Sequence, residues 1–282
     1  MCELVGMSAQ HSANFTFSLK ALAEHSDAGG PSDGWGIAYF DKEDARRIRD
    51  TSAAWNSPWT EFVAQTGLTS DLIIAHIRNL TVGEVALKNT QPFYRVLGGR
   101  AHVFAHNGHF PEVLTSEKFH THNFQRIGDT DSEQAFCLLL EQLRKMWIKG
   151  EKAPSFEQRW QTFQKYCAQL RPLGPANILY SDSEYLFVHG NRRTQSNGQI
   201  ESPGLHWLCR ECNESSGEAL VSDALTVHTE AQKVVLVASV PLTKEKWQPL
   251  DEGEMLAVHK GQIIAKAQPD NTNHFSPNNS NC

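Results

Sequence analysis

The chain has 282 residues, of which 40% are hydrophobic and 21% charged, and its formal net charge at pH 7 is −6. This length predicts one large domain or two small ones, with enough residues to bury a substantial core. The composition excludes the strongly basic surface typical of nucleic-acid-binding proteins, and no run of about 18 apolar residues predicts a membrane span.

The first half of the chain consists mostly of predicted strands. A short amphipathic run, TFSLKALAEH (16–25), predicts a helix. Three runs rich in β-branched and aromatic residues then predict strands over 34–40, 71–78 and 100–108.

Two longer helices are predicted in the middle of the chain, over 129–147 and 155–173. The first opens with Thr130 or Asp131 as its candidate N-cap. Glu133 follows three residues after Thr130 and completes a capping-box pattern. Apolar residues then recur at helical spacing in this first segment, and Pro172 and Gly174 end the second.

The last part of the chain returns to strands, predicted over 176–190, 204–210, 233–242 and 254–264. The first and last of these runs contain the polar stretches SDSE and HKG, which predict hairpin turns. Strands, two helices and strands again, without strict βαβ alternation, favour an α+β fold with antiparallel sheets and helices packed outside them. We expect one domain over 2–266 and a polar, disordered tail over 267–282.

Cys2, directly behind Met1, is the first candidate for chemistry. A thiol becomes a good nucleophile when a base accepts its proton. Removal of Met1 would give Cys2 a free α-amine, whose unperturbed pKa of about 7.7 to 8.0 leaves much of it neutral near physiological pH. The amine could then serve as the base, directly or through a water. The alternative is a small residue that fills the end of a strand.

The sequence His106-Asn107-Gly108 ends the predicted strand 100–108. Asn-Gly after an extended run usually indicates a tight turn. The alternative is an oxyanion hole, in which the Asn107 side-chain amide and the Gly108 backbone N–H point at one developing negative charge. Glycine permits backbone angles that aim its N–H where other residues could not.

Two charged residues could bind the charged groups of an amino acid. The Arg78 guanidinium can form a bidentate pair with a carboxylate, although a surface salt bridge is its commoner use. Asp131 could receive an ammonium group while Asp129 or Thr130 caps the helix. Together with a thiol and an oxyanion hole, these residues suit an α-amino acid whose side-chain carbonyl is attacked, and glutamine meets that description.

Six short motifs follow one another along the chain: MC at the start, DGWG (33–36), HIR followed by T and G (76–83), NTQPF (89–93), HNG (106–108) and TDSE (130–133). Their order resembles the class II (type-2) glutamine amidotransferases, a family of N-terminal-nucleophile hydrolases, and in particular its small stand-alone bacterial-type members without a fused synthase domain. The likeness covers roughly residues 2–260. It implies a four-layer α/β/β/α sandwich of two antiparallel sheets.

The resemblance also implies roles for individual residues. It makes Cys2 the nucleophile, with its own α-amine as general base. Asn107 and Gly108 become the oxyanion hole. Arg78 would hold the α-carboxylate of glutamine, and Asp131 would receive its α-amino group.

Other matches to the family concern the walls of the pocket. The resemblance places Thr81 in the substrate pocket and assigns Trp35 and Gly36 to one side of it. Val82 and Gln91 occupy positions that often carry histidine in the family. These two departures affect the shape of the pocket rather than the bond-making groups.

The predicted function is therefore that of a cysteine-nucleophile glutamine amidohydrolase or amidotransferase, which releases ammonia or an amine through a γ-glutamyl thioester. One alternative is a γ-glutamyl peptide or conjugate hydrolase with no ammonia acceptor, and another is a catalytically silent glutamine-sensing module. The expected ligand is glutamine or a γ-glutamyl small molecule, and a separate ammonia-accepting synthase would be its partner if the ammonia is transferred. We expect no cofactor, no metal, no nucleic acid and no membrane partner.

The cysteines bear on location and on metal binding. The six cysteines are too few and too unevenly spaced for a disulfide framework, and the chain does not begin with the basic-then-apolar pattern of a secretory signal. We therefore predict a reducing cytoplasm. CREC (209–212) is a lone CxxC without a second ligand pair, so a structural role is favoured over a zinc or redox site.

Overall fold

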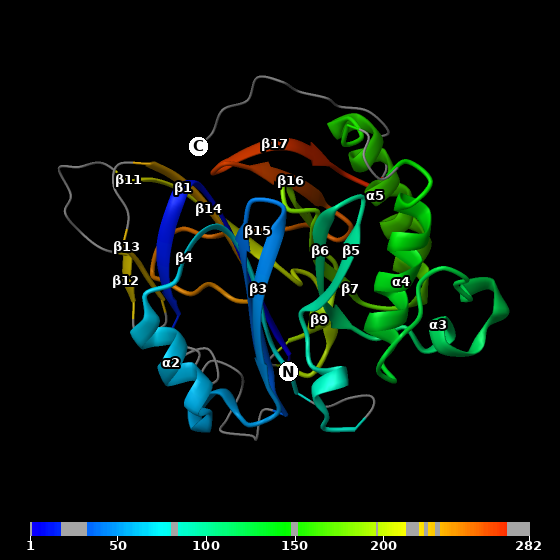
Figure 1. Ribbon diagram of the computed structural model, residues 1–282, viewed down its shortest axis with the longest axis horizontal. Coiled ribbons are helices and arrows are strands. Elements are labelled where there is room, and N and C mark those ends of the chain that lie inside the picture. Colours follow the sequence, from blue (N-terminus) through cyan, green and yellow to red (C-terminus); the bar gives the residue numbers. More distant parts are fainter. Residues whose placement is uncertain are drawn as a thin grey trace.

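Two antiparallel β-sheets stacked face to face form the centre of the molecule, and helices cover their outer faces (Figure 1). The computed structural model describes residues 2–17, 33–79, 84–147, 152–195, 197–212, 220–222, 225–228 and 232–269. This arrangement is the predicted four-layer α/β/β/α sandwich of the α+β class. No helix in the described part of the chain combines the length and apolar composition needed to span a bilayer.

The first sheet contains the N-terminal strand at its centre, in the order β15-β11-β14-β1-β4-β2-β3. Its strands are β1 (Glu3–Phe17), β2 (Trp35–Asp41), β3 (Asp44–Asp50), β4 (Thr69–Ile77), β11 (His206–Cys212), β14 (Gln232–Ala238) and β15 (Gln248–Pro249). The short strands β12 (Leu220–Ser222) and β13 (Leu225–His228) extend it beside β1. Its outer face packs against α2 (Pro58–Thr66) and the 3-10 turn η1 (Ala54–Asn56).

The second sheet has the order β17-β16-β8-β7-β6-β5. Its strands are β5 (Phe93–Leu97), β6 (Arg100–Gly108), β7 (Ala176–Ser181), β8 (Leu186–His189), β16 (Met255–His259) and β17 (Gln262–Ala267). Helices α4 (Asp131–Leu143) and α5 (Phe156–Leu170) cover its outer face. The short elements are α3 (Pro111–Thr115), η2 (Leu87–Asn89), η3 (Glu117–Phe119), η4 (Arg171–Leu173), β9 (Arg193–Thr194) and β10 (Ile200–Glu201).

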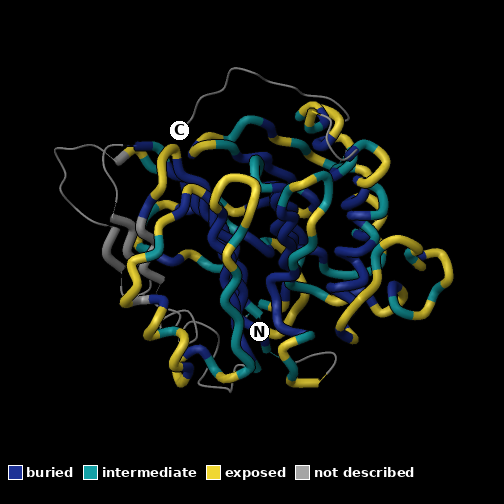
Figure 2. The backbone as a smooth tube through the Cα atoms, viewed as in Figure 1, coloured by how far each residue is buried: buried dark blue, intermediate teal, exposed yellow. Residues whose placement is uncertain are grey.

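The core lies in three apolar layers. Figure 2 shows that much of the backbone of both sheets is buried. β14 contributes to two of them, because Val234 and Leu236 face the helix side of the first sheet while Val235 and Val237 face the second sheet. A strand buried on both faces needs an unbroken apolar run, which explains the sequence KVVLVA. The aromatic layer beneath α4 and α5 completes the sandwich.

The predicted strands are confirmed, and so are both hairpins. β7 turns into β8 through Ser183, with φ 74°, and β16 turns into β17 through Lys260 and Gly261, with φ 46° and 72°. The helix predicted over 16–25 is wrong at its start, because β1 extends to Phe17. Residues 18–25 lie outside the described residues.

The N-termini of the two long helices differ from the predicted capping pattern. Thr130 caps α4 by accepting a hydrogen bond from the Glu133 N–H, as expected. However, the Glu133 carboxylate accepts from the Gly128 N–H at 2.7 Å and from Arg95 at 2.6 Å, so no reciprocal capping box forms there. A complete capping box instead begins α5, where the side chains of Ser155 and Gln158 bond each other's backbone N–H.

Candidate active site

Cys2 lies at one end of the sandwich, where β1 begins beside the end of β4. The antiparallel register pairs Glu3 with Ile77, so Cys2 lies next to Arg78. The Asn79 N–H donates a hydrogen bond to Cys2 Sγ at 3.2 Å, and the thiol donates to the Asn79 carbonyl at the same distance. The strand register therefore delivers both the candidate nucleophile and the candidate carboxylate-binding arginine to one place.

Asn107 reaches this place from the opposite sheet. Its Nδ2 donates to the Cys2 carbonyl oxygen at 2.6 Å, although the two residues are 105 positions apart in the chain. A side-chain amide carries two N–H donors, so one donor remains for another acceptor beside Cys2. The two sheets thus bring a thiol and an amide donor together.

Gly108 continues β6 rather than forming a tight turn, so the turn interpretation of Asn-Gly is wrong. It pairs with Ala176 of β7. A Cβ atom at Gly108 would lie 1.8 Å from the Pro175 carbonyl oxygen, so only glycine allows this close approach. Asn177 supports the same strand end by donating from Nδ2 to the Asn107 carbonyl at 3.1 Å.

Gln91 fixes β6 from the other side, a contribution that sequence reasoning did not identify. Its Oε1 accepts from the His106 N–H at 2.6 Å, and its Nε2 donates to the His106 carbonyl at 3.0 Å. The His106 ring is buried, stacks on Phe110 at 4.3 Å and lies 2.9 Å from the Ser132 hydroxyl. Gln91 and His106 therefore position the strand that carries Asn107.

Arg78 is buried, with only 4% of its surface exposed. Its Nη1 donates to the Glu84 carbonyl at 3.1 Å, and Asn89 Nδ2 donates to the same oxygen at 3.1 Å. Burial lowers the pKa of Arg78, while the neighbouring Cys2 and Asp33 raise it. The predicted pocket residue Thr81, and Val82 beside it, lie outside the described residues.

Asp131 is also buried, but the structure connects it to the segment after Gly108. Its Oδ2 accepts from the Phe110 N–H at 2.5 Å and from His109 Nδ1 at 3.1 Å, and its Oδ1 accepts from the Ser132 N–H. Because Thr130 caps α4, the Asp131 carboxylate is not used as the cap. Its proposed contact with a substrate amine stays a prediction.

The DGWG motif positions the end of β4. The Asp33 N–H donates to the Arg78 carbonyl, and the Arg78 N–H donates to the Gly34 carbonyl, each at 2.8 Å. Trp35 is wholly buried in the core on the helix side of the first sheet. A Cβ atom at Gly36 would lie 2.3 Å from the Gln91 carbonyl oxygen, so glycine makes room for the segment that carries Gln91. The predicted role of Trp35 and Gly36 in the wall of the substrate pocket stays a prediction.

The Cys2 thiol needs a base to become a thiolate. Burial raises the pKa of the Cys2 thiol, and the hydrogen bond from the Asn79 backbone lowers it. A thiol with a raised pKa is a weak nucleophile until a base takes its proton. The nearby His76 is a poor candidate, because burial, followed by the charges of His106 and Arg78, lowers its pKa to about 3.

His76 gives a prediction about acid stability. It is buried, and among the described residues neither of its ring nitrogens has a hydrogen-bond partner. With a folded pKa of about 3 against an unfolded value near 6.5, its contribution to stability is present above pH 6.5 and is lost as the pH falls. In His76→Leu, urea unfolding should therefore be less acid-sensitive than in wild type, by about 2 kcal/mol between pH 7 and pH 5. Parallel pH dependences of the two proteins would show that His76 is not buried and neutral.

The described residues contain no group of three or more His, Cys, Asp or Glu side chains that could hold a metal ion. Cys209 of the CREC motif lies in β11 and is disulfide-bonded, so it offers no thiolate to a metal. The site around Cys2 consists of a thiol, amide donors and buried ionic groups. A thiol with a neighbouring amide donor is the pair of groups that nucleophilic attack on a carbonyl requires.

Comparison with known proteins identifies the family of the chain. A sequence model of the class-II glutamine amidotransferases matches residues 1–281. The Escherichia coli (strain K12) protein named "Putative glutamine amidotransferase YafJ" is 36% identical over 266 residues, covering 90% of this chain and 96% of that protein. A Haemophilus influenzae protein with the description "Putative glutamine amidotransferase" is 32% identical over 272 residues, covering 94% of this chain and 87% of its own length.

Two solved structures resemble this chain. The crystal structure of a "predicted glutamine amidotransferase" from Pseudomonas aeruginosa PA01 is 28% identical, with a TM-score of 0.65, and covers 94% of this chain and all of that one. Glutamine phosphoribosylpyrophosphate amidotransferase from B. subtilis superposes with a TM-score of 0.57 over 98% of this chain and 50% of its own. At 16% identity, that second likeness concerns the fold alone.

The two-sheet sandwich is the fold of the N-terminal-nucleophile hydrolases. The chain belongs to the class-II glutamine amidotransferase family. The motif resemblance predicted both.

Proposed function

We propose that the protein hydrolyses the side-chain amide of glutamine, or a γ-glutamyl amide, with Cys2 as its nucleophile after removal of Met1. The observation that carries this proposal is the meeting of Cys2 and Asn107: the amide donor from the second sheet lies 2.6 Å from the Cys2 carbonyl oxygen and has a second N–H to offer. Family membership supports glutamine as the substrate. A cytoplasmic location stays a prediction from composition.

The proposed reaction begins when the freed α-amine of Cys2 takes the thiol proton. The thiolate attacks the γ-carbonyl carbon, and the negative oxygen that forms is stabilised by Asn107 Nδ2 and the Gly108 N–H. The intermediate collapses as the α-ammonium returns a proton to the leaving nitrogen, which departs as ammonia or an amine. Water then cleaves the γ-glutamyl thioester and regenerates the thiol.

Arg78 and Asp131 would select an α-amino acid in this scheme. Arg78 would bind the α-carboxylate, because its guanidinium is buried beside Cys2 and its planar fork of N–H donors matches the two oxygens of a carboxylate. Asp131 would receive the α-ammonium group. Thr81, Trp35 and Gly36 would complete the walls of the pocket.

The test measures ammonia release from L-glutamine and from 4-aminobutanamide, which is glutamine without its α-carboxylate. In Arg78→Lys we expect the KM for glutamine to rise roughly 10- to 100-fold, with kcat nearly unchanged, because lysine cannot form the bidentate pair. The weak turnover of 4-aminobutanamide should not change. Arg46→Lys, at an exposed position of β3, is the matched control.

Two results would contradict this assignment. If the Met1-free wild type binds glutamine but releases no ammonia, the protein is a sensing module rather than a hydrolase. If Arg78→Lys affects glutamine and 4-aminobutanamide equally, Arg78 does not bind the α-carboxylate.

A further inference from the structure

A cavity of about 260 Å³ opens at the side of the sandwich, between the edge strands β3 and β5. Its walls come from β3, η2, β5 and the region around the start of α4. The charged lining residues are Arg47, Arg49, Lys88, Arg95 and Glu133. Aromatic and aliphatic side chains, including Phe93, Tyr94, Val96 and Ile127, form the remainder.

The charges in this cavity are not balanced. Glu133 is wholly buried and is engaged by Arg95 at 2.6 Å, and Lys88 forms ion pairs with Glu84 and Asp129 outside. In the part of the chain that the structure describes, neither Arg47 nor Arg49 forms an ion pair. These two guanidinium groups are therefore the ones that an anion could neutralise.

Arg47 and Arg49 are held in place by uncharged partners. Arg49 Nη1 donates to the carbonyls of Leu87 and Thr90 at 2.8 and 2.6 Å. The Arg47 guanidinium lies over the Tyr94 ring, 5.6 Å from its centre, and its Nη1 donates a long hydrogen bond of 3.4 Å to the Pro92 carbonyl. Each guanidinium has five N–H donors, so donors remain on both for a ligand.

The arginines also repel each other in a partly desolvated place. Burial, together with the charge of Arg47, lowers the pKa of Arg49 to about 10. Burial and the charge of Arg95 lower the pKa of Arg47. The negative charge of Glu133 raises both pKa values, so it offsets part of this effect. Both guanidinium groups stay charged at neutral pH, and the single lining carboxylate leaves an excess of positive charge in the cavity.

We propose that this cavity binds a dianionic phosphate group, either free or as the monoester of a small molecule, through Arg47 and Arg49. Planar guanidinium forks match the oxygen geometry of phosphate. The cavity of about 260 Å³ is larger than a single phosphate needs. For scale, one water in the liquid occupies about 30 Å³. The lining also includes Tyr94 and Ile127, whose apolar surfaces suit a small organic group.

The cavity shares a wall with the candidate active site. The carbonyls that Arg49 holds belong to residues 87 and 90, and the same segment supplies the Glu84 carbonyl to Arg78 and the Gln91 side chain to His106. A ligand that draws Arg49 away from Leu87 and Thr90 would therefore change the support of Arg78. This consequence rests on the proposed function, whereas the binding itself does not.

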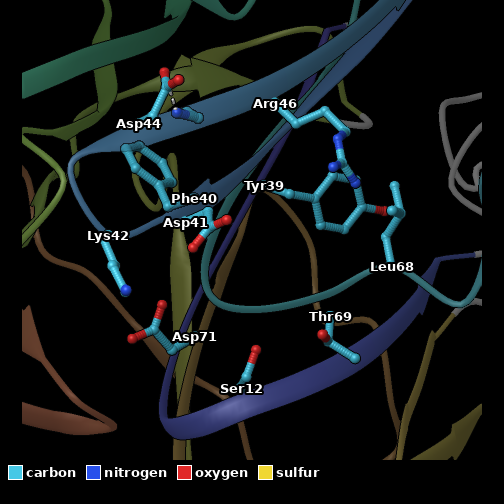
Figure 3. A pocket seen from close by; sticks show the side chains of 11 residues that line it. Ser12, Tyr39, Phe40, Asp41, Lys42, Asp44, Arg46, Leu68, Thr69 and Asp71 are labelled. Carbon is cyan, nitrogen blue, oxygen red and sulfur yellow. Dashed lines mark hydrogen bonds between the residues drawn. The ribbon is translucent and has the colours of Figure 1, made fainter.

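Arg46 offers a matched control on the same strand. It points to the opposite face of β3 and lines a separate cavity with Tyr39 (Figure 3). The lining of that cavity includes Asp41, Asp44 and Asp71, which disfavour an anion. Removing the Arg46 charge alters the net charge as much as removing that of Arg47.

The experiment is isothermal titration of the full chain at low ionic strength with inorganic phosphate and with glucose 6-phosphate, and glucose serves as the uncharged reference. We expect saturable binding in wild type and Arg46→Gln, and at least a tenfold loss of affinity in Arg47→Gln and Arg49→Gln. Tighter binding of glucose 6-phosphate than of phosphate identifies a monoester site. Equal binding identifies a site for free phosphate.

The proposal is overturned by non-saturable binding in wild type or by unchanged affinity in a folded Arg47→Gln. Arg49→Gln loses two bonds to carbonyls, so Arg47→Gln decides the question if the Arg49 variant fails to fold. The same titration of Cys2→Ala should give the wild-type affinity. This arm separates failure of the phosphate site from failure of the proposed catalysis.

Discussion

Cys2→Ala should release ammonia from glutamine at least about 10⁴-fold more slowly than wild type, because the substitution removes the atom that forms the thioester. The fold should survive. Among the described residues, the Cys2 thiol forms hydrogen bonds with the backbone of Asn79 and with no other group, so the free energy of unfolding should change by about 1 kcal/mol or less. Steady-state ammonia release and urea unfolding measure the two quantities.

Cys2→Ser is the matched comparison, since it keeps the shape of the side chain and the hydrogen bonds to Asn79 but lowers the nucleophilicity. It should be far less active than wild type. A folded Cys2→Ala protein that retains substantial turnover would remove Cys2 from the mechanism.

Asn107→Ala should lower kcat by about 10²–10³-fold, because an oxyanion donor acts mainly in the transition state. The KM for glutamine should change much less. The variant also leaves the Cys2 carbonyl oxygen without the Asn107 donor, which should cost about 1–3 kcal/mol of stability. Kinetics on protein shown to be folded by urea titration separate these two effects.

The exposed Asn197, whose side chain bonds Glu201, provides the control substitution Asn197→Ala. It should leave kcat and KM as in wild type. Near-normal turnover in a folded Asn107→Ala protein would contradict the oxyanion-hole assignment.

The sequence predicted the elements that have strong apolar patterns. β6 and β14 could be recognised because β-branched and aromatic residues fill them, and the hairpins because a polar turn divides each apolar run. β3 could not, since its sequence DARRIRD is charged. Its strand character comes from pairing with β2 at the sheet edge, which is a tertiary effect.

The candidate site could be predicted only in part for the same reason. The motifs identified Cys2, Arg78 and Asn107, but the contact between Cys2 and Asn107 depends on how two sheets stack. The sequence alone did not reveal that Asn79 holds the thiol. The only local signal was its position directly after Arg78, at the end of a predicted strand.

Gln91 illustrates the limit most clearly. In the sequence it was a departure from a family pattern, and its effect on the pocket was open. In the structure its amide bonds both the N–H and the carbonyl of His106 and so supports the strand that carries Asn107. Two hydrogen bonds to the backbone of a distant residue leave no periodic pattern that sequence analysis could detect.

The central claim is that Cys2 becomes the nucleophile once Met1 is removed. Intact-mass analysis of wild type and Cys2→Ala, before and after exposure to a glutamine-like electrophile, tests it most directly. The account predicts that wild type lacks Met1 and gains one adduct, and that Cys2→Ala gains none. A wild-type chain that retains Met1 and takes no label, or a labelled Cys2→Ala chain, would contradict it.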